Sequence, residues 1–256
     1  MKRKSKKIFV TGSTGKIGTY LTKALKRNSW EVICLRNDIN ETEKYEKQLK
    51  GCQVIYHLAV YQNILDDQYE KFYKVNVLGT KNLLDLAVKY KIKKFIYVST
   101  AMVFKNTGKI ERNEKWPKKK TSDNFYVESK LRALEIVNRY KKKIPIIVLY
   151  PSIVLDPKGK GFNGKLMRWV GKRNRIENFI LMANLIKMMV KVIDKGKIGE
   201  DYILGGKNII LKNLFNMTIP IWFIKIFSFI KIVKAVSKNP PGDLCLNTEK
   251  INNILK

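Results

Sequence analysis

The sequence predicts an α/β protein built on a parallel, doubly wound sheet. Short apolar runs alternate with longer segments of helical periodicity through the first 150 residues, which is the order that successive βαβ units require. The first apolar run also leads directly into a glycine-rich turn and then into an amphipathic helix. This arrangement is typical of parallel sheets that bind ligands at the carboxyl ends of their strands.

Five apolar runs are predicted as strands of this sheet. Too few residues separate the second run from the third for a full helix–strand–helix insertion, so we expect one edge strand to be shortened or missing. The predicted strands are Ile8–Val10, Glu31–Leu35, Gln53–Leu58, Phe95–Ser99 and Ile146–Tyr150, and the predicted helices cover Ile17–Leu25, Tyr69–Tyr90 and Tyr126–Tyr140.

The pattern loosens after Tyr150, and we expect a domain boundary there, with residues 1–150 as the sheet domain and residues 151–256 as a small, trimmed C-terminal lobe. In the lobe, Phe179–Ile193 is predicted as a Met-rich helix. Ile219–Val236 is predicted as an apolar helix that carries too many lysines for a membrane span. Two hypotheses for this helix stay open: a lid over the substrate pocket, and a helix lying weakly on an anionic membrane surface.

The turn after the first strand carries the strongest motif of the chain, Val-Thr-Gly-Ser-Thr-Gly-Lys-Ile-Gly. In this context Gly12 permits a tight turn, Gly15 lets backbone N–H groups approach a pyrophosphate, and Gly18 lets the helix pack against the strand. The positive end of the helix dipole then faces the phosphates. The sequence therefore predicts a Rossmann-type dinucleotide site, formed by Gly12, Ser13, Thr14, Gly15, Lys16, Ile17 and Gly18.

Arg36, at the end of the second predicted strand, bears on the choice of dinucleotide. An acidic residue in this region selects NAD by binding the ribose 2′-hydroxyl, whereas an arginine accommodates the 2′-phosphate of NADP. The sequence therefore favours NADP, with NAD as the alternative.

A second motif, Tyr126-Val-Glu-Ser-Lys130, lies in a predicted helix. Residues four apart share one helix face. An ammonium group near a phenol favours the phenolate, so we expect Lys130 to lower the pKa of Tyr126 from about 10 toward neutrality. Thr100, which follows a predicted strand, can hydrogen-bond a substrate oxygen beside Tyr126. The three residues predict an acid–base site.

With these motifs in place, the chain resembles the extended short-chain dehydrogenase/reductases. This branch includes nucleotide-sugar epimerases and dehydratases, dihydroflavonol-type reductases and 3β-hydroxysteroid-type dehydrogenases. The matching pieces occur in the family's order and cover most of the chain: TGSTGKIG (11–18), GCQVIYHLAV (51–60), NVLGTKNLL (76–84), FIYVSTAMVF (95–104), YVESK (126–130), LYPSIV (149–154) and KGKIGEDYILGG (195–206).

The resemblance implies a role for each matched residue. Tyr126 would be the catalytic acid/base, Lys130 would tune it and hold the nicotinamide ribose, and Thr100 would assist at the substrate oxygen. The resemblance implies cofactor contacts for Ser99, Leu58 and Ala59 along the dinucleotide, for Arg36 at the adenosine ribose and for Asp38 near the adenine. By contrast, Asn76 is interpreted as structural and His57 as a strand-end residue rather than a catalyst.

Two departures from the family limit what can be carried over. The 4,6-dehydratases place Asp-Glu directly after the catalytic threonine, but this chain has Ala101 and Met102 there, so that dehydration lacks its acid and base. The segment from Gly161 to Phe179 is also shorter than in the family, and Ala183-Asn184 replaces an acidic pair that the resemblance leads us to expect after it. The substrate lobe is therefore trimmed.

The sequence predicts an NAD(P)-dependent oxidoreductase that transfers hydride between a nicotinamide and a carbonyl or secondary alcohol carbon. One alternative is a nucleotide-sugar 4-epimerase with tightly bound NAD. Another is a non-catalytic NADP-binding regulator, which the joint presence of Thr100, Tyr126 and Lys130 disfavours. The expected substrate is a small molecule, either a nucleotide sugar or an apolar ketone or alcohol, and a homodimer stays open.

Composition bears on nucleic-acid binding, metal sites, disulfides and cellular location. The net charge is +31, but lysine accounts for most of the 52 basic residues and they are spread along the chain, so we interpret them as solvated faces rather than a specific nucleic-acid surface. Three dispersed cysteines and a single histidine predict no zinc site, no other metal site and no disulfide framework. With no signal-peptide pattern after Met1, the expected location is the cytoplasm.

Overall fold

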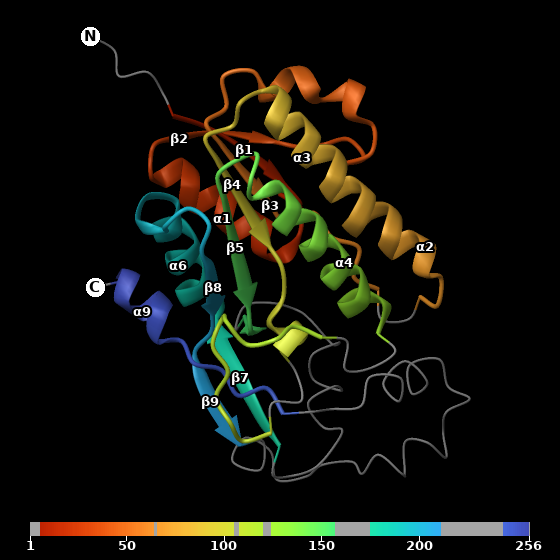
Figure 1. The fold of residues 1–256 in the computed structure, drawn as a ribbon. Coiled ribbons are helices and arrows are strands. Elements are labelled where there is room, and N and C mark those ends of the chain that lie inside the picture. The colour runs from red at the N-terminus through yellow and green to blue at the C-terminus, as the bar shows by residue number, and fades with distance from the viewer. Residues whose placement is uncertain are drawn as a thin grey trace.

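The structure is a computed structural model that describes residues 6–63, 66–104, 108–119, 124–156, 175–210 and 243–255. Its centre is a six-stranded sheet with the strand order β2-β1-β3-β4-β5-β8, and all neighbouring strands run parallel (Figure 1). The predicted doubly wound α/β fold is thereby confirmed. The strands are β1 (Lys6–Thr11), β2 (Trp30–Cys34), β3 (Val54–His57), β4 (Lys94–Val98), β5 (Ile146–Pro151) and β8 (Asp201–Leu204).

Helices cover both faces of this sheet (Figure 1). Alternate strand residues point to opposite faces, so each strand contributes to both layers: Ile96 packs with the helices on one face and Phe95 with those on the other. One face is covered by α1 (Lys16–Arg27) and α6 (Met182–Lys195), and the other by α3 (Gly79–Lys89) and α4 (Phe125–Tyr140).

The predicted loss of an edge strand is confirmed, because β2 ends the sheet beyond β1. The connection from β2 to β3 contains only the short 3-10 turns Thr42–Lys44 and Glu46–Leu49. Tyr45, between these turns, is fully buried and donates a hydrogen bond of 2.7 Å to the carbonyl of Ile39. The shortened connection therefore still packs against the sheet.

The predicted helix Tyr69–Tyr90 is present but not uniform. It begins as α2 (Tyr69–Phe72), continues through a π-helical segment (Tyr73–Leu78) and ends as α3. The π segment contains the buried Asn76. Such segments frequently accompany functional sites because they re-aim side chains within a helix.

A smaller three-stranded sheet has the order β6-β7-β9, from β6 (Ile153–Leu155), β7 (Ile176–Leu181) and β9 (Lys207–Ile210). The prediction of one helix over Phe179–Ile193 is wrong at its start, since β7 extends to Leu181 and α6 begins at Met182. The apolar run has no Gly or Pro at this junction to separate strand from helix. The predicted helix Ile219–Val236 lies outside the described residues.

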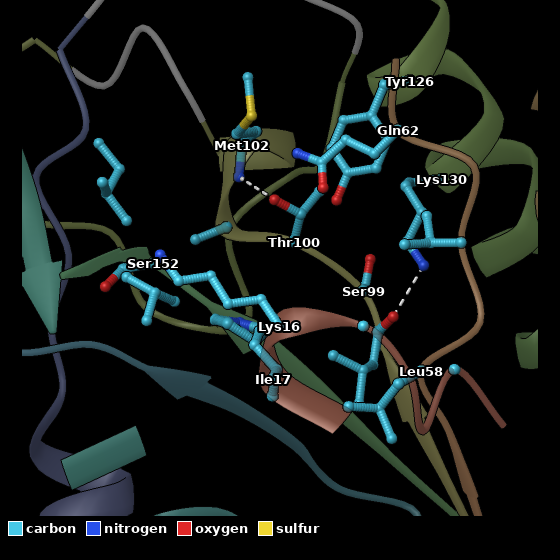
Figure 2. Close-up of a pocket in the computed structure, with 18 of the residues that line it drawn as sticks. Lys16, Ile17, Leu58, Gln62, Ser99, Thr100, Met102, Tyr126, Lys130 and Ser152 are labelled. Atoms are coloured by element: carbon cyan, nitrogen blue, oxygen red, sulfur yellow. Dashed lines mark hydrogen bonds between the residues drawn. The ribbon is translucent and has the colours of Figure 1, made fainter. Parts of the chain in front are cut away.

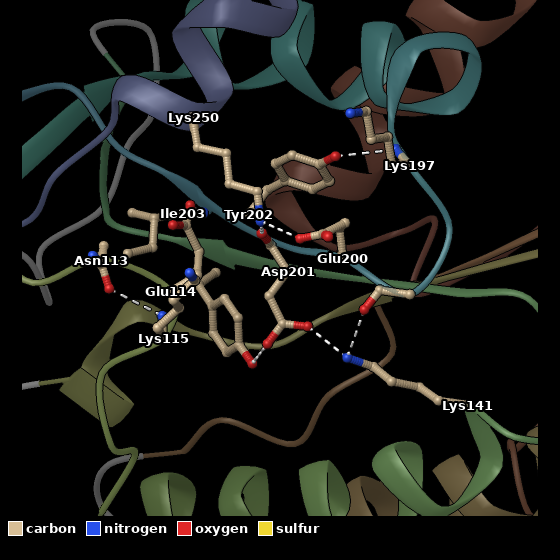
Figure 3. Close-up of polar contacts among 12 residues, drawn as sticks. Asn113, Glu114, Lys115, Lys141, Lys197, Glu200, Asp201, Tyr202, Ile203 and Lys250 are labelled. Atoms are coloured by element: carbon tan, nitrogen blue, oxygen red, sulfur yellow. Dashed lines mark hydrogen bonds and ion pairs between the residues drawn. The ribbon is translucent and has the colours of Figure 1, made fainter.

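The far edge of the main sheet, β8, is held by segments distant in sequence. Glu114 accepts a hydrogen bond of 2.9 Å from the backbone N–H of Ile203, and Asp201 binds Lys141 at 2.7 Å (Figure 3). The C-terminal helix α9 (Glu249–Leu255) adds Lys250, which binds Glu200 at 2.5 Å. Because β8 follows residue 150, the six-stranded sheet draws on both sides of that position.

Candidate active site

One cavity of about 400 Å³ lies at the carboxyl ends of the central strands. It extends from the glycine-rich turn at the start of α1 to the first turns of α4 (Figure 2). Its described lining consists of Gly12, Gly15, Lys16, Ile17, Gly18, Leu58, Val60, Gln62, Val98, Ser99, Thr100, Ala101, Met102, Tyr126, Lys130, Pro151, Ser152, Ile153, Val154 and Leu244.

The glycine-rich turn is built by close backbone contacts that exclude side chains. Gly12 has a φ of +68°, and a Cβ atom there would lie 2.7 Å from the backbone nitrogen of Ala59. A Cβ atom on Gly18 would lie 2.1 Å from the carbonyl oxygen of Gly12. These contacts agree with the tight turn predicted at Gly12 and the close helix packing predicted at Gly18.

The same turn carries polar groups suited to a dinucleotide. Gly15 occupies the N-cap position of α1 without a capping side chain, so backbone N–H groups of the first turn face the cavity end of the helix. Among the described residues, the buried hydroxyls of Ser13 and Ser99 have no hydrogen-bond partner. A buried hydroxyl without a partner is costly. The exposed helix end, the missing Cβ atoms and these hydroxyls fit a dinucleotide along the turn.

At the other end of the cavity, the side chains of Tyr126 and Thr100 face each other (Figure 2). The N-cap residue Asn124 fixes the first turn of α4 by accepting from the backbone N–H groups of Tyr126 at 2.9 Å and Val127 at 3.2 Å. Thr100 also accepts from the backbone N–H of Met102 at 3.2 Å. The predicted pairing of Thr100 with Tyr126 is therefore present.

Lys130 lies one turn further along α4 and is almost fully buried. Its Nζ donates a hydrogen bond of 2.7 Å to the carbonyl of Val98 and lies 4.5 Å from the centre of the Tyr97 ring. Burial lowers the pKa of Lys130 to about 7. The ammonium group is held by a carbonyl dipole and an aromatic face rather than by an acidic partner.

The predicted fall in the pKa of Tyr126 is wrong for this structure. Burial raises that pKa to about 12, and the neighbouring Thr100 hydroxyl offsets only part of the rise. Removing the phenolate from water costs more than the neighbouring hydroxyl gains for it. Tyr126 therefore carries its proton at neutral pH.

Five of the predicted cofactor residues do not line the cavity. Ser13 is buried, Ala59 is partly buried and Thr14 is exposed. Arg36 is exposed beyond the end of β2. Asp38 is also exposed, and its carboxylate accepts from the backbone N–H of Asn40 at 2.9 Å, which lowers the pKa of that carboxyl.

The structure adds lining residues that sequence reasoning missed. Gln62 lies beside Tyr126 and Thr100 (Figure 2), and Leu244 reaches the cavity from near the C-terminus. Ser152 contributes a third buried serine hydroxyl that has no partner among the described residues. Ser152 lies within the family-like piece LYPSIV, which could have identified it, but Gln62 and Leu244 carry no motif.

The described residues contain no group of three or more His, Cys, Asp or Glu side chains that could hold a metal ion. Within the same described ranges, no helix is long and apolar enough to cross a membrane.

The fold and this cavity define a dinucleotide-binding protein of the Rossmann type, with a Tyr–Lys–Thr group at the far end of the cavity. The profile of the NAD dependent epimerase/dehydratase family matches residues 8–205. The chain therefore belongs to this family, within the extended short-chain dehydrogenase/reductases.

Individual relatives are distant. The UDP-glucose 4-epimerase of Vibrio cholerae is 26% identical over 87% of this chain and 81% of its own length. The dTDP-D-glucose 4,6-dehydratase of Dictyostelium discoideum is also 26% identical, over 78% of this chain, which spans only 58% of that relative. The structure of UDP-glucuronic acid 4-epimerase from Bacillus cereus, in complex with UDP-glucuronic acid and NAD, has a TM-score of 0.78 and 22% identity, with 97% of this chain and 92% of that one covered. This likeness shows the shared fold.

Proposed function

We propose that the protein is an NAD(P)-dependent oxidoreductase that interconverts a carbonyl group and a secondary alcohol. The observation that carries the proposal is the placement of Tyr126, Thr100 and Lys130 in one cavity with the glycine-rich turn. When bound along that turn, the nicotinamide cofactor supplies or accepts the hydride.

The state of Tyr126 favours the reductive direction. Its pKa of about 12 keeps the hydroxyl protonated at neutral pH, and a protonated phenol can donate to a carbonyl oxygen that gains negative charge as hydride arrives. The hydroxyl of Thr100 lies beside it and can hydrogen-bond the same oxygen. Lys130, held against Val98 and Tyr97, stabilises the phenolate that remains after proton transfer.

Dehydration is disfavoured at this site. Ala101 and Met102 follow Thr100 in the cavity wall, and no described lining residue is acidic. The elimination of water that the 4,6-dehydratases perform needs an acid and a base next to the threonine. The relationship to a dehydratase thus concerns fold and cofactor chemistry rather than this reaction.

Epimerisation is the second candidate, favoured by the relationship to the Vibrio cholerae epimerase. It needs the same Tyr126, Thr100 and Lys130, with the hydride returned to the opposite face of the substrate. The two candidates differ in outcome, since an epimerase regenerates its NAD in each cycle and a reductase consumes NADPH or NADH.

The cavity wall around Tyr126 supports an apolar substrate over a nucleotide sugar. Val60, Met102, Ile153 and Leu244 contribute apolar surface to the cavity, and Gln62 adds a neutral polar group beside Tyr126 and Thr100. Ile153 and Leu244 come from residues 151–256, which supports assigning substrate contacts to this part of the chain and cofactor contacts to residues 1–150.

NADP is the proposed preferred cofactor. Arg36 is exposed just beyond β2, next to the strand whose end carries the glycine-rich turn. Its exposed guanidinium can meet a 2′-phosphate in solvent, and the carboxylate of Asp38 accepts hydrogen bonds from Asn40 instead.

Two measurements test the proposal. Mass spectrometry of natively purified protein identifies any retained dinucleotide, and NADPH and NADH consumption is then followed with a panel of apolar ketones and with UDP- and dTDP-sugars. The proposal expects net consumption with a ketone. Conversion of UDP-glucose without net consumption establishes the epimerase instead, and tight cofactor binding with neither reaction supports a regulator.

A further inference from the structure

A chain of buried polar side chains runs from the glycine-rich turn to the helix that carries the catalytic tyrosine. Its five members are at most 1% exposed, and none of them lines the cavity. They come from β1, β3, the π-helical segment, α3 and α4, and they are Thr11, His57, Asn76, Thr80 and Ser129.

The first half of the chain centres on His57, the only histidine of the sequence. Thr11, which directly precedes Gly12, places its Oγ1 at 2.7 Å from Nδ1 of His57. The other ring nitrogen, Nε2, lies 2.9 Å from Oγ1 of Thr80. Both ring nitrogens of His57 are therefore used within the protein.

The second half leads on to Tyr126. Thr80 donates a hydrogen bond of 2.6 Å to the carbonyl of Asn76. The side-chain amide of Asn76 donates to Oγ of Ser129 at 2.8 Å, and Ser129 donates to the carbonyl of Tyr126 at 2.8 Å. A continuous hydrogen-bonded path thus joins Thr11 to the backbone of Tyr126.

The donor count fixes a single state of His57. The hydroxyl of Thr80 donates its one proton to the carbonyl of Asn76. Its oxygen therefore accepts from Nε2–H of His57. Nδ1 then carries no proton and accepts from the hydroxyl of Thr11. Burial and the nearby Lys130 lower the pKa of His57 to about 3, so the ring stays neutral at physiological pH.

This path also fixes the loop after β3. Oγ1 of Thr11 accepts from the backbone N–H groups of Leu58 at 3.2 Å and Ala59 at 3.1 Å. Asn76 binds both backbone groups of Tyr61, accepting from its N–H at 2.7 Å and donating to its carbonyl at 3.0 Å. Residues 58–61 are thereby held at both ends, which sets the direction of Leu58 and Val60 into the cavity.

We propose that His57 is a positioning residue that couples the glycine-rich turn to helix α4, so that the turn, loop 58–62 and Tyr126 adopt one arrangement when a dinucleotide is bound. The inference rests on the proposed function, since the coupling has meaning only if the turn binds a dinucleotide. His57 does not line the cavity, and it acts through Thr11 on one side and Thr80 on the other.

A double-mutant cycle with NAD⁺ and NADP⁺ as ligands tests the coupling. Thr80 does not line the cavity, yet Thr80→Val is expected to weaken dinucleotide affinity about 5-fold or more, measured by titration calorimetry. In a His57→Asn background, the same substitution is expected to change affinity less than about 2-fold, because the path is already broken. An equal effect in both backgrounds overturns the proposal.

Hydrogen exchange gives a second readout that does not depend on His57 variants folding well. In the wild type, NAD⁺ is expected to protect amides of residues 12–18, of loop 58–62 and of the first turns of α4. Ser129→Ala breaks the path at its far end, and protection of α4 is expected to be lost while that of residues 12–18 persists. Unchanged protection of α4 in this variant overturns the proposal.

Tyr56→Phe is the matched control. Tyr56 precedes His57 in β3 and is equally buried, but its hydroxyl bonds Met189 on the opposite face of the sheet at 3.2 Å. The Tyr56→Phe variant is expected to lower the melting temperature, as Thr80→Val does, but to leave dinucleotide affinity unchanged. If affinity falls equally in both variants, the effect is general destabilisation and the coupling is wrong. If the wild type binds neither dinucleotide, the proposed function itself fails.

Discussion

The two ends of the cavity are built by opposite physical means. At the glycine-rich turn, backbone segments approach so closely that side-chain atoms are excluded at Gly12 and Gly18. At the far end, polar side chains are packed into the cavity wall, where burial displaces the pKa of both Tyr126 and Lys130. One end is limited by space and the other by electrostatics.

This difference indicates which substitutions each end of the cavity tolerates. The turn is sensitive to volume, so a single added methyl group is disruptive even though it carries no charge. The Tyr126–Lys130 end is sensitive to protons and charge, so variants that keep the volume there fold but lose chemistry. Four substitutions examine this contrast, from the largest expected effect to the smallest.

Gly18→Ala is expected to have the largest effect. Its Cβ atom would lie 2.1 Å from the carbonyl oxygen of Gly12, so α1 must move away from the turn. We expect a loss of about 3 kcal/mol of stability and no measurable dinucleotide binding by calorimetry. Gly15→Ala is the control, because its φ is −70° and its Cβ would meet only Gly12 at 3.3 Å. The Gly15→Ala variant should fold normally and lose only dinucleotide affinity. Equal stability of Gly15→Ala and Gly18→Ala would contradict the contrast between the two ends of the cavity.

Tyr126→Phe removes the proton donor and keeps the ring. Turnover is expected to fall by roughly 10²–10⁴, while dinucleotide affinity stays within about 2-fold of wild type. Steady-state kinetics and calorimetry measure the two quantities. Tyr140→Phe, at the other end of α4, removes a hydroxyl that binds Asp85 and should leave turnover unchanged. Near-normal turnover in Tyr126→Phe would falsify the catalytic assignment.

Lys130→Met should raise stability at low pH while turnover is lost. The pKa of Lys130 is about 7 in the folded protein and 10.5 in its ordinary state, so below pH 7 folding buries a charge at a cost of about 4 to 5 kcal/mol. Between pH 7 and 10.5 the unfolded chain binds more protons, so wild-type stability rises with pH. The advantage of the variant in melting temperature should therefore shrink from pH 6 to pH 10. Parallel curves would show that the lysine is not buried as a cation.

Arg36→Asp should give the smallest effect, because it changes only the exposed side chain proposed to meet the 2′-phosphate of NADP. NADP⁺ affinity is expected to fall about tenfold, with little change for NAD⁺. Calorimetric titration of wild type and variant with both dinucleotides measures the ratio. Tighter binding of NAD⁺ than NADP⁺ by the wild type contradicts the role given to Arg36.

Local patterns predicted the sheet and the residues that chemistry needs. Tyr126 and Lys130 share a helix face because of their spacing, and Gly12, Gly15 and Gly18 occupy a strand–turn–helix order that leaves little choice of conformation. These features depend on neighbours in the sequence, so the sequence is sufficient to find them.

Features that depend on distant packing were missed or misjudged. The pKa of Tyr126 was predicted from the nearby Lys130, but its direction is set by how deeply the fold buries the phenol. Leu244 reaches the cavity only because the C-terminal segment pairs with Ile176, through a hydrogen bond of 2.8 Å. The junction between β7 and α6 has no breaker residue, so an apolar run of ambiguous period concealed it.

The place of β8 in the sheet has a consequence for synthesis of the chain. Strand β5 has a neighbour on both sides only because β8, some 50 residues later, pairs with its outer side. Until the ribosome has released residues 201–204, β5 is an open edge whose residues are all buried in the finished protein. Nascent chains that end near residue 150 therefore present an apolar strand to other chains, and we expect them to depend on chaperones.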